Sequence, residues 1–391
     1  MKAREKKESN AKNKVPRIIV TGGGSGGHLS PALAVMQQIR QQCPEAEILY
    51  LGGRLAMEGV RQPSLEQKIL PQTPWPHRFI HAGKLQRRFS LSSLWLLKGV
   101  LPGLIESFYH LLHFRPAVVF STGGYVSVPV VIAAWLLRIP ILIHEQTAAL
   151  GLSNRLAAYL AHEIFITFRS SLKYFPPHKT TLTGNPLRAE VLQARQRRQK
   201  KKKKQELKTI YLTGGAQGSH LLNQTVLPLL PELTKQYRLI HQCGDNPRYH
   251  DYEKLKKARE KLSPSQQKNY HLIPYLSAEE LKEVWTAADL LIGRAGANTV
   301  YESMVLGLPT IFIPIPWVTN NEQYKNARVV VNAGSGRILR EEELSPSRLG
   351  EEIENLAANY EEYWQRAQSL SAEVPLRASE KIAAKILRYA T

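Results

Sequence analysis

The chain has 391 residues, more than one hydrophobic core usually supports, and its 43% hydrophobic and 22% charged residues are ordinary for a globular enzyme. The two cysteines stand far apart without metal-ligand spacing, which excludes a disulfide framework and a structural zinc site. The net charge of +21 points to an acidic partner, which can be nucleic acid, an anionic membrane or a phosphorylated substrate.

The N-terminal segment, residues 1–15, is charged and lacks an apolar core region, so we expect a disordered basic tail of a cytoplasmic protein rather than a secretion signal. Residues 16–187 follow as a first domain of alternating strands and helices. Its strands are predicted from short apolar runs at 17–21, 47–51, 117–121, 141–144, 163–167 and 180–183. The longest apolar stretches, 94–112 and 126–137, are broken by charged residues or proline, so no transmembrane helix is expected.

The pattern restarts in a second domain, residues 188–366, which includes a basic segment at 195–206. That segment is typical of a solvated linker or helix face, and membrane or nucleic-acid contact is the alternative. The strands of this domain are predicted at 209–212, 238–241, 271–275, 290–292, 309–314 and 336–339. A helix over 367–391 is expected to pack across both domains. Continuous apolar strands alternating with helices predict the α/β class, with two doubly wound Rossmann-like domains facing across a cleft.

The first predicted strand ends in a glycine-rich turn, from Gly22 to His28, that satisfies G-x-G-x-x-G. Backbone amides of such a turn, together with the positive end of the next helix, can meet an anion or a closely approaching sugar. A nicotinamide-binding domain also needs an acidic residue after the second strand, where this chain has Arg54. The dinucleotide interpretation therefore loses its main support. We expect His28 to contact the ligand or act in catalysis, although an ordinary surface or core histidine also fits this position.

Polar groups follow the third and fourth strands as well, at Thr122-Gly-Gly-Tyr125 and His144-Glu-Gln-Thr147. In a parallel sheet the carboxyl ends of neighbouring strands meet at one edge, and ligands collect there. Three adjacent strand ends therefore converge on one rim, which predicts a binding site.

In the second domain, the strand at 290–292 runs through a glycine turn into a helix. In one interpretation, Thr299 caps the helix and Glu302 completes a capping box. In the other, the turn binds phosphate and the Glu302 carboxylate accepts hydrogen bonds from a ribose diol. The loop at 314–327 supplies amide and carboxylate groups that can match sugar hydroxyls. The three aspartates form no D-x-D pair, so we expect amide donors and cations, and no metal ion, to meet leaving-group charge.

These segments together resemble the family of undecaprenyl-diphospho-muramoylpentapeptide β-N-acetylglucosaminyltransferases, the MurG family, over almost the whole chain after the tail. The most specific parts of the resemblance are residues 22–28 with 31–34, 123–127, 139–146, 184–188, 214–218 with 223–224, 294–302, and 323 with 326–327. The resemblance implies the two-domain GT-B architecture, which agrees with the predicted strands.

The resemblance implies that the second domain binds UDP-N-acetylglucosamine and that the first binds a polyprenyl-diphosphate-linked acceptor. Implied donor contacts are Tyr275 and Leu276 at the uracil, Glu302 at the ribose, Glu322 and Gln323 at the sugar, and Ser25, Gly26, Gly27, Arg188, Ala216, Gln217, Gly218, Arg294, Gly296, Ala297 and Thr299 elsewhere. Implied acceptor contacts are Gly23, Gly24, Gly123, Gly124, Tyr125, Gln146 and Thr147. No cofactor and no metal are implied.

The implied reaction is the inverting transfer of N-acetylglucosamine to the C4 hydroxyl of undecaprenyl-diphospho-N-acetylmuramoyl-pentapeptide, which converts lipid I to lipid II in peptidoglycan synthesis. His28 is the preferred general base because imidazole titrates near neutral pH, and Glu145 is the second choice. The chain departs from the family pattern at Thr147, where Asn is usual, at Ala216, where Ser is common, and at Glu322, where Gln or His is common.

A polyprenyl substrate implies peripheral binding to an anionic membrane surface, at the cytoplasmic face of the bacterial plasma membrane. The segment 84–98 combines apolar side chains with basic flanks, as an interfacial helix does, and core packing explains it equally well. Another GT-B enzyme, either a diacylglycerol glycosyltransferase or a UDP-sugar 2-epimerase, is the first alternative. A non-catalytic nucleic-acid binder is the remote one, motivated by charge alone, so no nucleic-acid partner is expected.

Overall fold

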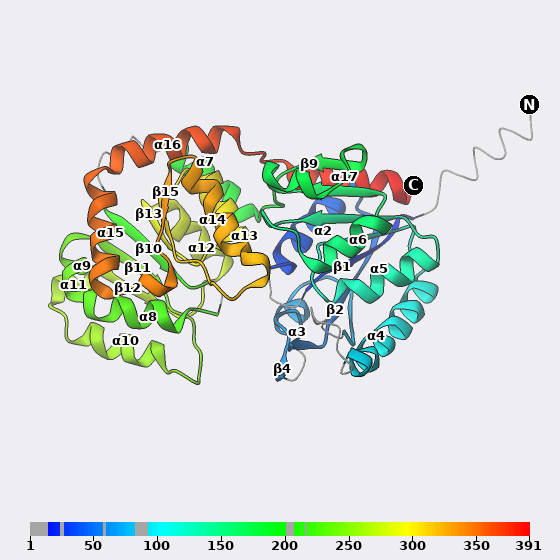
Figure 1. Cartoon of the computed structure of the whole chain (residues 1–391), viewed down its shortest axis with the longest axis horizontal. Coiled ribbons are helices and arrows are strands. Elements are labelled where there is room, and N and C mark those ends of the chain that lie inside the picture. Colours follow the sequence, from blue (N-terminus) through cyan, green and yellow to red (C-terminus); the bar gives the residue numbers. More distant parts are fainter. Residues whose placement is uncertain (1–14, 24–26, 58–59, 83–92, 201–206, 216) are drawn as a thin grey trace, which may run out of the picture. The chain divides into compact units, whose positions relative to one another are not determined.

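The computed structural model describes the chain except for residues 1–14, 24–26, 58–59, 83–92, 201–206 and 216. The chain forms two compact units, with residues 1–187 and 375–391 in unit 1 and residues 188–374 in unit 2 (Figure 1). Each unit is built on a parallel β-sheet flanked by helices, which confirms the predicted α/β class with two doubly wound domains. Within the described ranges, no helix combines the length and the apolar character needed to cross a membrane.

Unit 1 contains a seven-stranded parallel sheet in the order β5-β2-β1-β6-β7-β8-β9. Its strands are β1 Arg17–Thr21, β2 Glu47–Gly53, β5 His77–Ile80, β6 Val118–Ser121, β7 Ile141–Glu145, β8 Glu163–Ile166 and β9 Thr180–Leu182. The sequence did not predict β5, because this edge strand is short and only Ile80 is fully buried. A small antiparallel pair, β3 Leu55–Met57 and β4 Val60–Pro63, lies outside the sheet.

The two faces of the unit 1 sheet carry separate hydrophobic cores, because successive strand residues point to opposite sides. On one face, Ile18 and Val20 pack with α2 Leu29–Gln42 and α17 Ala378–Ala390. On the other face, Ile19 packs with helices α4 Ser93–Phe114, α5 Ser127–Leu136 and α6 Leu152–Leu160. The remaining helices are α3 Leu65–Ile69 and the short 3-10 helices η1 Leu70–Gln72, η2 Arg169–Tyr174 and η3 Pro177–Lys179.

Unit 2 contains a six-stranded parallel sheet in the order β12-β11-β10-β13-β14-β15. Its strands are β10 Thr209–Thr213, β11 Arg238–Gln242, β12 Tyr270–Ile273, β13 Leu290–Gly293, β14 Thr310–Phe312 and β15 Gly336–Ile338. Each corresponds to a predicted strand. One core joins alternate strand residues such as Ile210 to helices α8 His220–Val226, α9 Leu230–Gln236, α10 Asp251–Glu260 and α15 Pro346–Ala358. On the other face, Tyr211 meets Trp285 edge-to-face at 5.1 Å.

The remaining helices of unit 2 are α7 Ala189–Lys200, α11 Pro264–Asn269, α12 Ala278–Ala287, α13 Ala297–Leu306, α14 Glu322–Asn332, α16 Tyr360–Glu373, and the 3-10 helices η4 Leu227–Leu229, η5 Thr319–Asn321 and η6 Glu341–Glu343. Residues 367–391 are not one helix: they form the end of α16, in unit 2, and α17, in unit 1. Val374 ends α16 in an extended conformation, and proline at 375 follows it, so the helix cannot continue.

Two arginines of the basic helix α7 bind the carboxyl ends of other helices in unit 2. The Arg198 guanidinium donates to Leu306 O at 3.1 Å and to Trp285 O at 3.2 Å, and it also contacts Ala288 O. Arg195 bonds to Val305 O and to Ser371. An arginine at the carboxyl end of a helix donates to carbonyl groups that lack a partner within the helix. Its positive charge also interacts favourably with the negative end of the helix dipole. The basic run, for which the sequence predicted a solvated linker or helix face, therefore begins as a helix that packs through Arg195 and Arg198.

Candidate functional site

The strand order reverses in unit 1 between β1 and β6, where two glycine turns meet backbone to backbone. Gly23 N donates to Gly123 O at 3.2 Å. Gly124 has φ +83°, and a Cβ on it would lie 2.0 Å from Gly23 O, so a side chain is excluded there. Tyr125 follows, half-buried. The contact places both turns at the topological switch point, which is where doubly wound sheets bind ligands.

His28 lies beside this contact, immediately before α2. Its Nδ1 is 2.7 Å from Thr122 O. A carbonyl oxygen only accepts, so Nδ1 carries the proton and Nε2 keeps a free lone pair. Gln146 Nε2 lies 2.7 Å from Nδ1, whereas Gln146 Oε1 is buried without a partner. Exchanging the amide oxygen and nitrogen lets the oxygen accept from the Nδ1 proton, which satisfies the network. Burial lowers the pKa of His28 below 6.5, so the ring is neutral at pH 7.

Glu145, the second candidate base, is engaged in its own loop. Its carboxylate accepts hydrogen bonds from Thr147 N and Oγ1 at 3.0 and 2.8 Å, from Gly151 N at 3.2 Å and from Asn154 Nδ2 at 3.1 Å. The residue is 2% exposed. Thr147, which replaces the usual Asn, thus fixes the Glu145 carboxylate. Asn154 carried no signal in the sequence, because only the fold brings its helix against this loop.

In unit 2 the strand order reverses between β10 and β13, and the second glycine loop lies there. Gly218 has φ +73°, and a Cβ on it would lie 1.9 Å from Cys243 O, so the loop packs directly on the end of β11. Arg294 holds the same loop: its guanidinium donates to Ser219 Oγ at 3.0 Å, to Ile313 O at 3.1 Å and to Glu341 at 3.0 Å. Through these hydrogen bonds, Arg294 holds the second glycine loop in position.

Glu302 is 4% exposed and lies on α13. Arg188 donates to its Oε1 at 2.6 Å from Nη2 and at 3.2 Å from Nε. The capping-box interpretation is wrong, because α13 is capped by Gly296 and Thr299 lies inside the helix. The Glu302 carboxylate is instead held by an arginine at the start of unit 2.

The other predicted donor residues lie on this rim or in the loops around it. Gly296 and Ala297 form the N-terminus of α13, and Glu322 is the first residue of α14. The Gln323 side chain accepts from Ile315 N at 3.1 Å and so fixes the loop before α14. Tyr275 is 54% exposed and donates to Asp245 O, Leu276 is half-buried, and Gln217 is exposed beside the glycine loop.

Several predicted contacts lie outside the described residues. They are Gly24, Ser25, Gly26 and Ala216, together with part of the interfacial segment, residues 84–92. Gly27 is described and lies in the turn before α2. Over the described part of the chain, no cluster of three or more His, Cys, Asp or Glu side chains that could hold a metal ion is found.

Comparison with known proteins agrees with this arrangement. Residues 18–166 match the glycosyltransferase family 28 N-terminal domain, and residues 209–383 match the glycosyltransferase family 28 C-terminal domain. The solved structure of MurG from Acinetobacter baumannii superimposes with a TM-score of 0.70 at 24% identity, covering 95% of this chain and 99% of that one. This likeness confirms the GT-B fold.

Two curated relatives bear the name UDP-N-acetylglucosamine–N-acetylmuramyl-(pentapeptide) pyrophosphoryl-undecaprenol N-acetylglucosamine transferase. The one from Lactococcus lactis subsp. cremoris is 35% identical over 92% of this chain and 96% of its own length. The one from Bacillus cereus is 33% identical over 87% of this chain and 90% of its own length. The chain therefore belongs to glycosyltransferase family 28, as its resemblance to the MurG family predicted.

Proposed function

We propose that this chain transfers N-acetylglucosamine from UDP-N-acetylglucosamine to the C4 hydroxyl of undecaprenyl-diphospho-N-acetylmuramoyl-pentapeptide, with inversion. Curated relatives of that name cover most of the chain. The observation that carries the chemistry is the 2.7 Å hydrogen bond between His28 Nδ1 and Thr122 O, which leaves the Nε2 lone pair available. A neutral imidazole beside two glycine turns is suited to take a proton from a sugar hydroxyl bound there.

In the proposed step, the acceptor C4 oxygen forms a bond to the anomeric carbon while the bond from that carbon to the UDP phosphate oxygen breaks. His28 Nε2 takes the hydroxyl proton, and UDP leaves with the bonding electron pair. The anomeric configuration changes from α to β. Glu145 is not used as base, because four hydrogen bonds from its own loop already occupy its carboxylate and hold it in place.

The donor side of the proposal rests on unit 2. Glu302 would accept hydrogen bonds from the ribose hydroxyls, and its bond to Arg188 keeps the buried carboxylate oriented. The diphosphate would meet the N-terminus of α13 and the amides of the second glycine loop, which stabilise the developing charge on UDP. Arg294 acts through Ser219, as a positioning residue for that loop.

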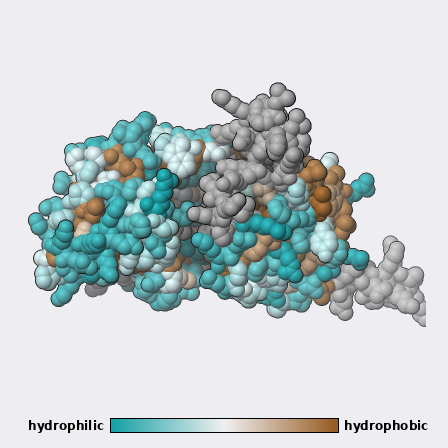
Figure 2. All heavy atoms as spheres, turned by 90° about the horizontal axis from the view of Figure 1, so that it is seen from below, coloured by the Kyte–Doolittle hydropathy of each residue, from teal (hydrophilic) through white to brown (hydrophobic). Residues whose placement is uncertain are grey.

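We further propose that unit 1 docks on an anionic membrane surface. Along α4, four side chains on one face are more than half exposed: Leu101, Ile105, Tyr109 and Leu112. Trp135 on α5 is 52% exposed and Tyr159 on α6 is 78% exposed, with the exposed Arg138 and Arg155 nearby in sequence. Helix α4 packs on α5, and α5 packs on α6. Figure 2 shows hydrophobic atoms gathered on the unit 1 surface, at the right of the view. Aromatic and apolar groups beside arginines are suited to a lipid interface.

The test is transfer of labelled N-acetylglucosamine to a short-chain analogue of the muramoyl lipid, with product identification. His28→Ala should lower turnover by about 10²–10⁴-fold while UDP affinity stays within about twofold, because loss of a general base leaves donor binding intact. His178→Ala, at an exposed histidine of the same unit, is the matched control and should keep full turnover. Near-normal turnover of His28→Ala removes this residue from the role. Epimerised UDP-sugar, or transfer to diacylglycerol alone, would favour the alternative enzymes on this fold.

A further inference from the structure

The unit 2 sheet has an open edge at β15, which pairs with β14 alone among the described strands. Thr310 N donates to Ser335 O at 3.2 Å, and Leu339 N donates to Phe312 O at 2.9 Å. Backbone groups alternate in direction along a strand, so Gly336 and Ile338 turn their N–H and C=O groups away from β14. Gly336 is buried and Ile338 is half-buried, so Ile338 is the position at which the edge offers a backbone donor and acceptor.

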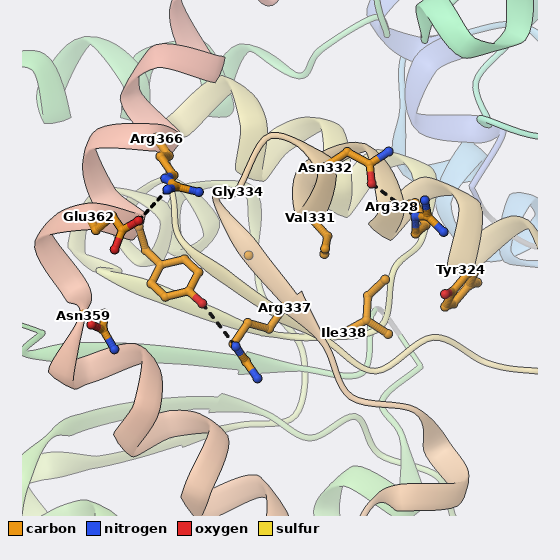
Figure 3. Close-up of a pocket in the computed structure, with 12 residues that line it drawn as sticks. Tyr324, Arg328, Val331, Asn332, Gly334, Arg337, Ile338, Asn359, Glu362 and Arg366 are labelled. Atoms are coloured by element: carbon orange, nitrogen blue, oxygen red, sulfur yellow. Dashed lines mark hydrogen bonds and ion pairs between the residues drawn. The ribbon is translucent and has the colours of Figure 1, made fainter.

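A cavity of ≈ 730 Å³ runs along this edge. Helix α14 forms one wall, with Tyr324 and Arg328, and α16 forms the other, with Tyr363 and Arg366 (Figure 3). Residues of β15 itself lie between them and make the floor. We call this cavity the β15 groove. It differs from the proposed donor site, which lies at the carboxyl ends of β10 and β13.

The β15 groove is positively charged. Its lining includes Arg328, Arg337 and Arg366 against one carboxylate, Glu362, which Arg366 meets at 2.5 Å. Arg337 is paired with the buried Glu352 and reaches Tyr363 Oη at 3.4 Å. Arg328 donates to Asn332 Oδ1 at 3.2 Å and also bonds to the Tyr324 hydroxyl, and no carboxylate pairs with it among the described residues. Its guanidinium is therefore available to an anionic partner.

Gly334 leaves room for the Arg366 side chain in the groove. Gly334 has φ +71°, and a Cβ on it would lie 2.3 Å from Arg366 Nη1. The Arg366 side chain therefore lies where any other residue at 334 would place its own side chain. The groove thus holds the Arg366–Glu362 ion pair beside an unpaired strand edge.

We propose that the β15 groove binds an acidic segment of a partner protein, in extended conformation, as an added strand on β15. Strand addition uses the free edge for affinity and neighbouring side chains for specificity. The arginines select acidic side chains, and they would repel a second copy of this chain, which would bring the same arginines face to face. This inference goes beyond the proposed function and does not depend on it.

The test uses the full chain and a fluorescein-labelled peptide, acetyl-Glu-Val-Glu-Val-Glu-amide, followed by fluorescence anisotropy. Saturable binding is expected, weakened about fivefold or more by Arg328→Ala, which corresponds to about 1 kcal/mol for one charged contact. Arg238→Ala, at an exposed arginine of β11, is the control and should bind normally. A Lys-Val repeat should not bind the parent chain but should bind Arg328→Glu.

Backbone pairing is tested separately with two probes of the same charge, N-methylated on alternate residues. In an added strand only one set of amides faces β15, so one methylated probe should bind and the other should not. Equal affinity of both overturns strand addition, and displacement by pyrophosphate with equal affinity identifies a small-anion site instead. If no acidic probe saturates the chain at millimolar concentration, the proposal is wrong. The arginines then serve only to protect the β15 edge from aggregation. Dimerisation lost in Arg328→Ala would identify a second copy as the occupant.

Discussion

At the residue scale, the chemistry of the site depends on which nitrogen of one ring is free. The sequence presents His28 after a glycine turn, but its tautomer is set by Thr122, a residue 94 positions away. The hydrogen bond to Thr122 and the charge of Glu145, at the end of β7, both raise the pKa of His28 and oppose the larger effect of burial. Burial prevails because the charged ring loses more hydration than the carboxylates return.

The pH dependence of transfer follows from this balance. The folded-state pKa of His28 lies below 6.5, so the ring stays unprotonated at pH values where a free imidazole is already charged. We expect kcat/KM to decrease only at pH values below 6.5. Protonation of His28 as the pH falls through its folded-state pKa removes the general base. Steady-state kinetics between about pH 4.5 and 8 measure this. A limb at or above pH 6.5 would contradict the assignment of His28 as a buried neutral base.

At the element scale, helix α7 shows how a basic segment becomes part of a fold. Arg195 and Arg198 serve the carboxyl ends of α12, α13 and α16, whereas Arg197 and Lys200 remain exposed. The sequence pattern of this run gave no reason to separate these residues, because its residues are uniformly basic or polar. The separation comes from the helical period, which turns Arg195 and Arg198, three positions apart, to the same face.

Substitution within α7 should therefore have position-specific effects on stability. Arg198→Ala leaves helix-terminal carbonyls without their charged donor, and we expect the free energy of unfolding of unit 2 to fall by about 2–3 kcal/mol. Lys200→Ala removes the same charge from an exposed position of the same helix and should change it by less than about 0.5 kcal/mol. Urea denaturation of the two variants and the parent chain provides the comparison. Equal effects would mean that α7 contributes through net charge alone.

At the scale of the whole molecule, the net charge of +21 is distributed among different tasks. Some arginines support helices or loops inside unit 2, some line the β15 groove, and others lie near the exposed apolar side chains of unit 1. Membership of glycosyltransferase family 28 removes the main reason to assign this charge to nucleic acid. Under the membrane proposal, the positive charge of unit 1 near those apolar side chains binds anionic lipid.

Membrane docking is tested with vesicles. The parent chain should co-sediment with vesicles containing phosphatidylglycerol and much less with pure phosphatidylcholine, since each basic residue near the surface contributes about 1 kcal/mol. Trp135→Glu should lower the bound fraction several-fold, because a carboxylate then enters the interface. Trp317→Glu makes the same change at a 79% exposed tryptophan of unit 2 and should bind like the parent. Binding that ignores both lipid charge and Trp135→Glu would remove unit 1 as the docking surface.

The sequence by itself determined the class of fold, the twelve strands that correspond to its apolar runs, and the two glycine turns, because these depend on local periodicity and on residues with special backbone freedom. Together with the family resemblance, it also indicated the reaction. Only the tertiary structure decided that Arg188 holds Glu302, that Glu145 is bound by its own loop, and that the β15 groove places an arginine without a carboxylate partner beside a free strand edge. These contacts join residues brought together by packing, so no spacing along the chain reveals them.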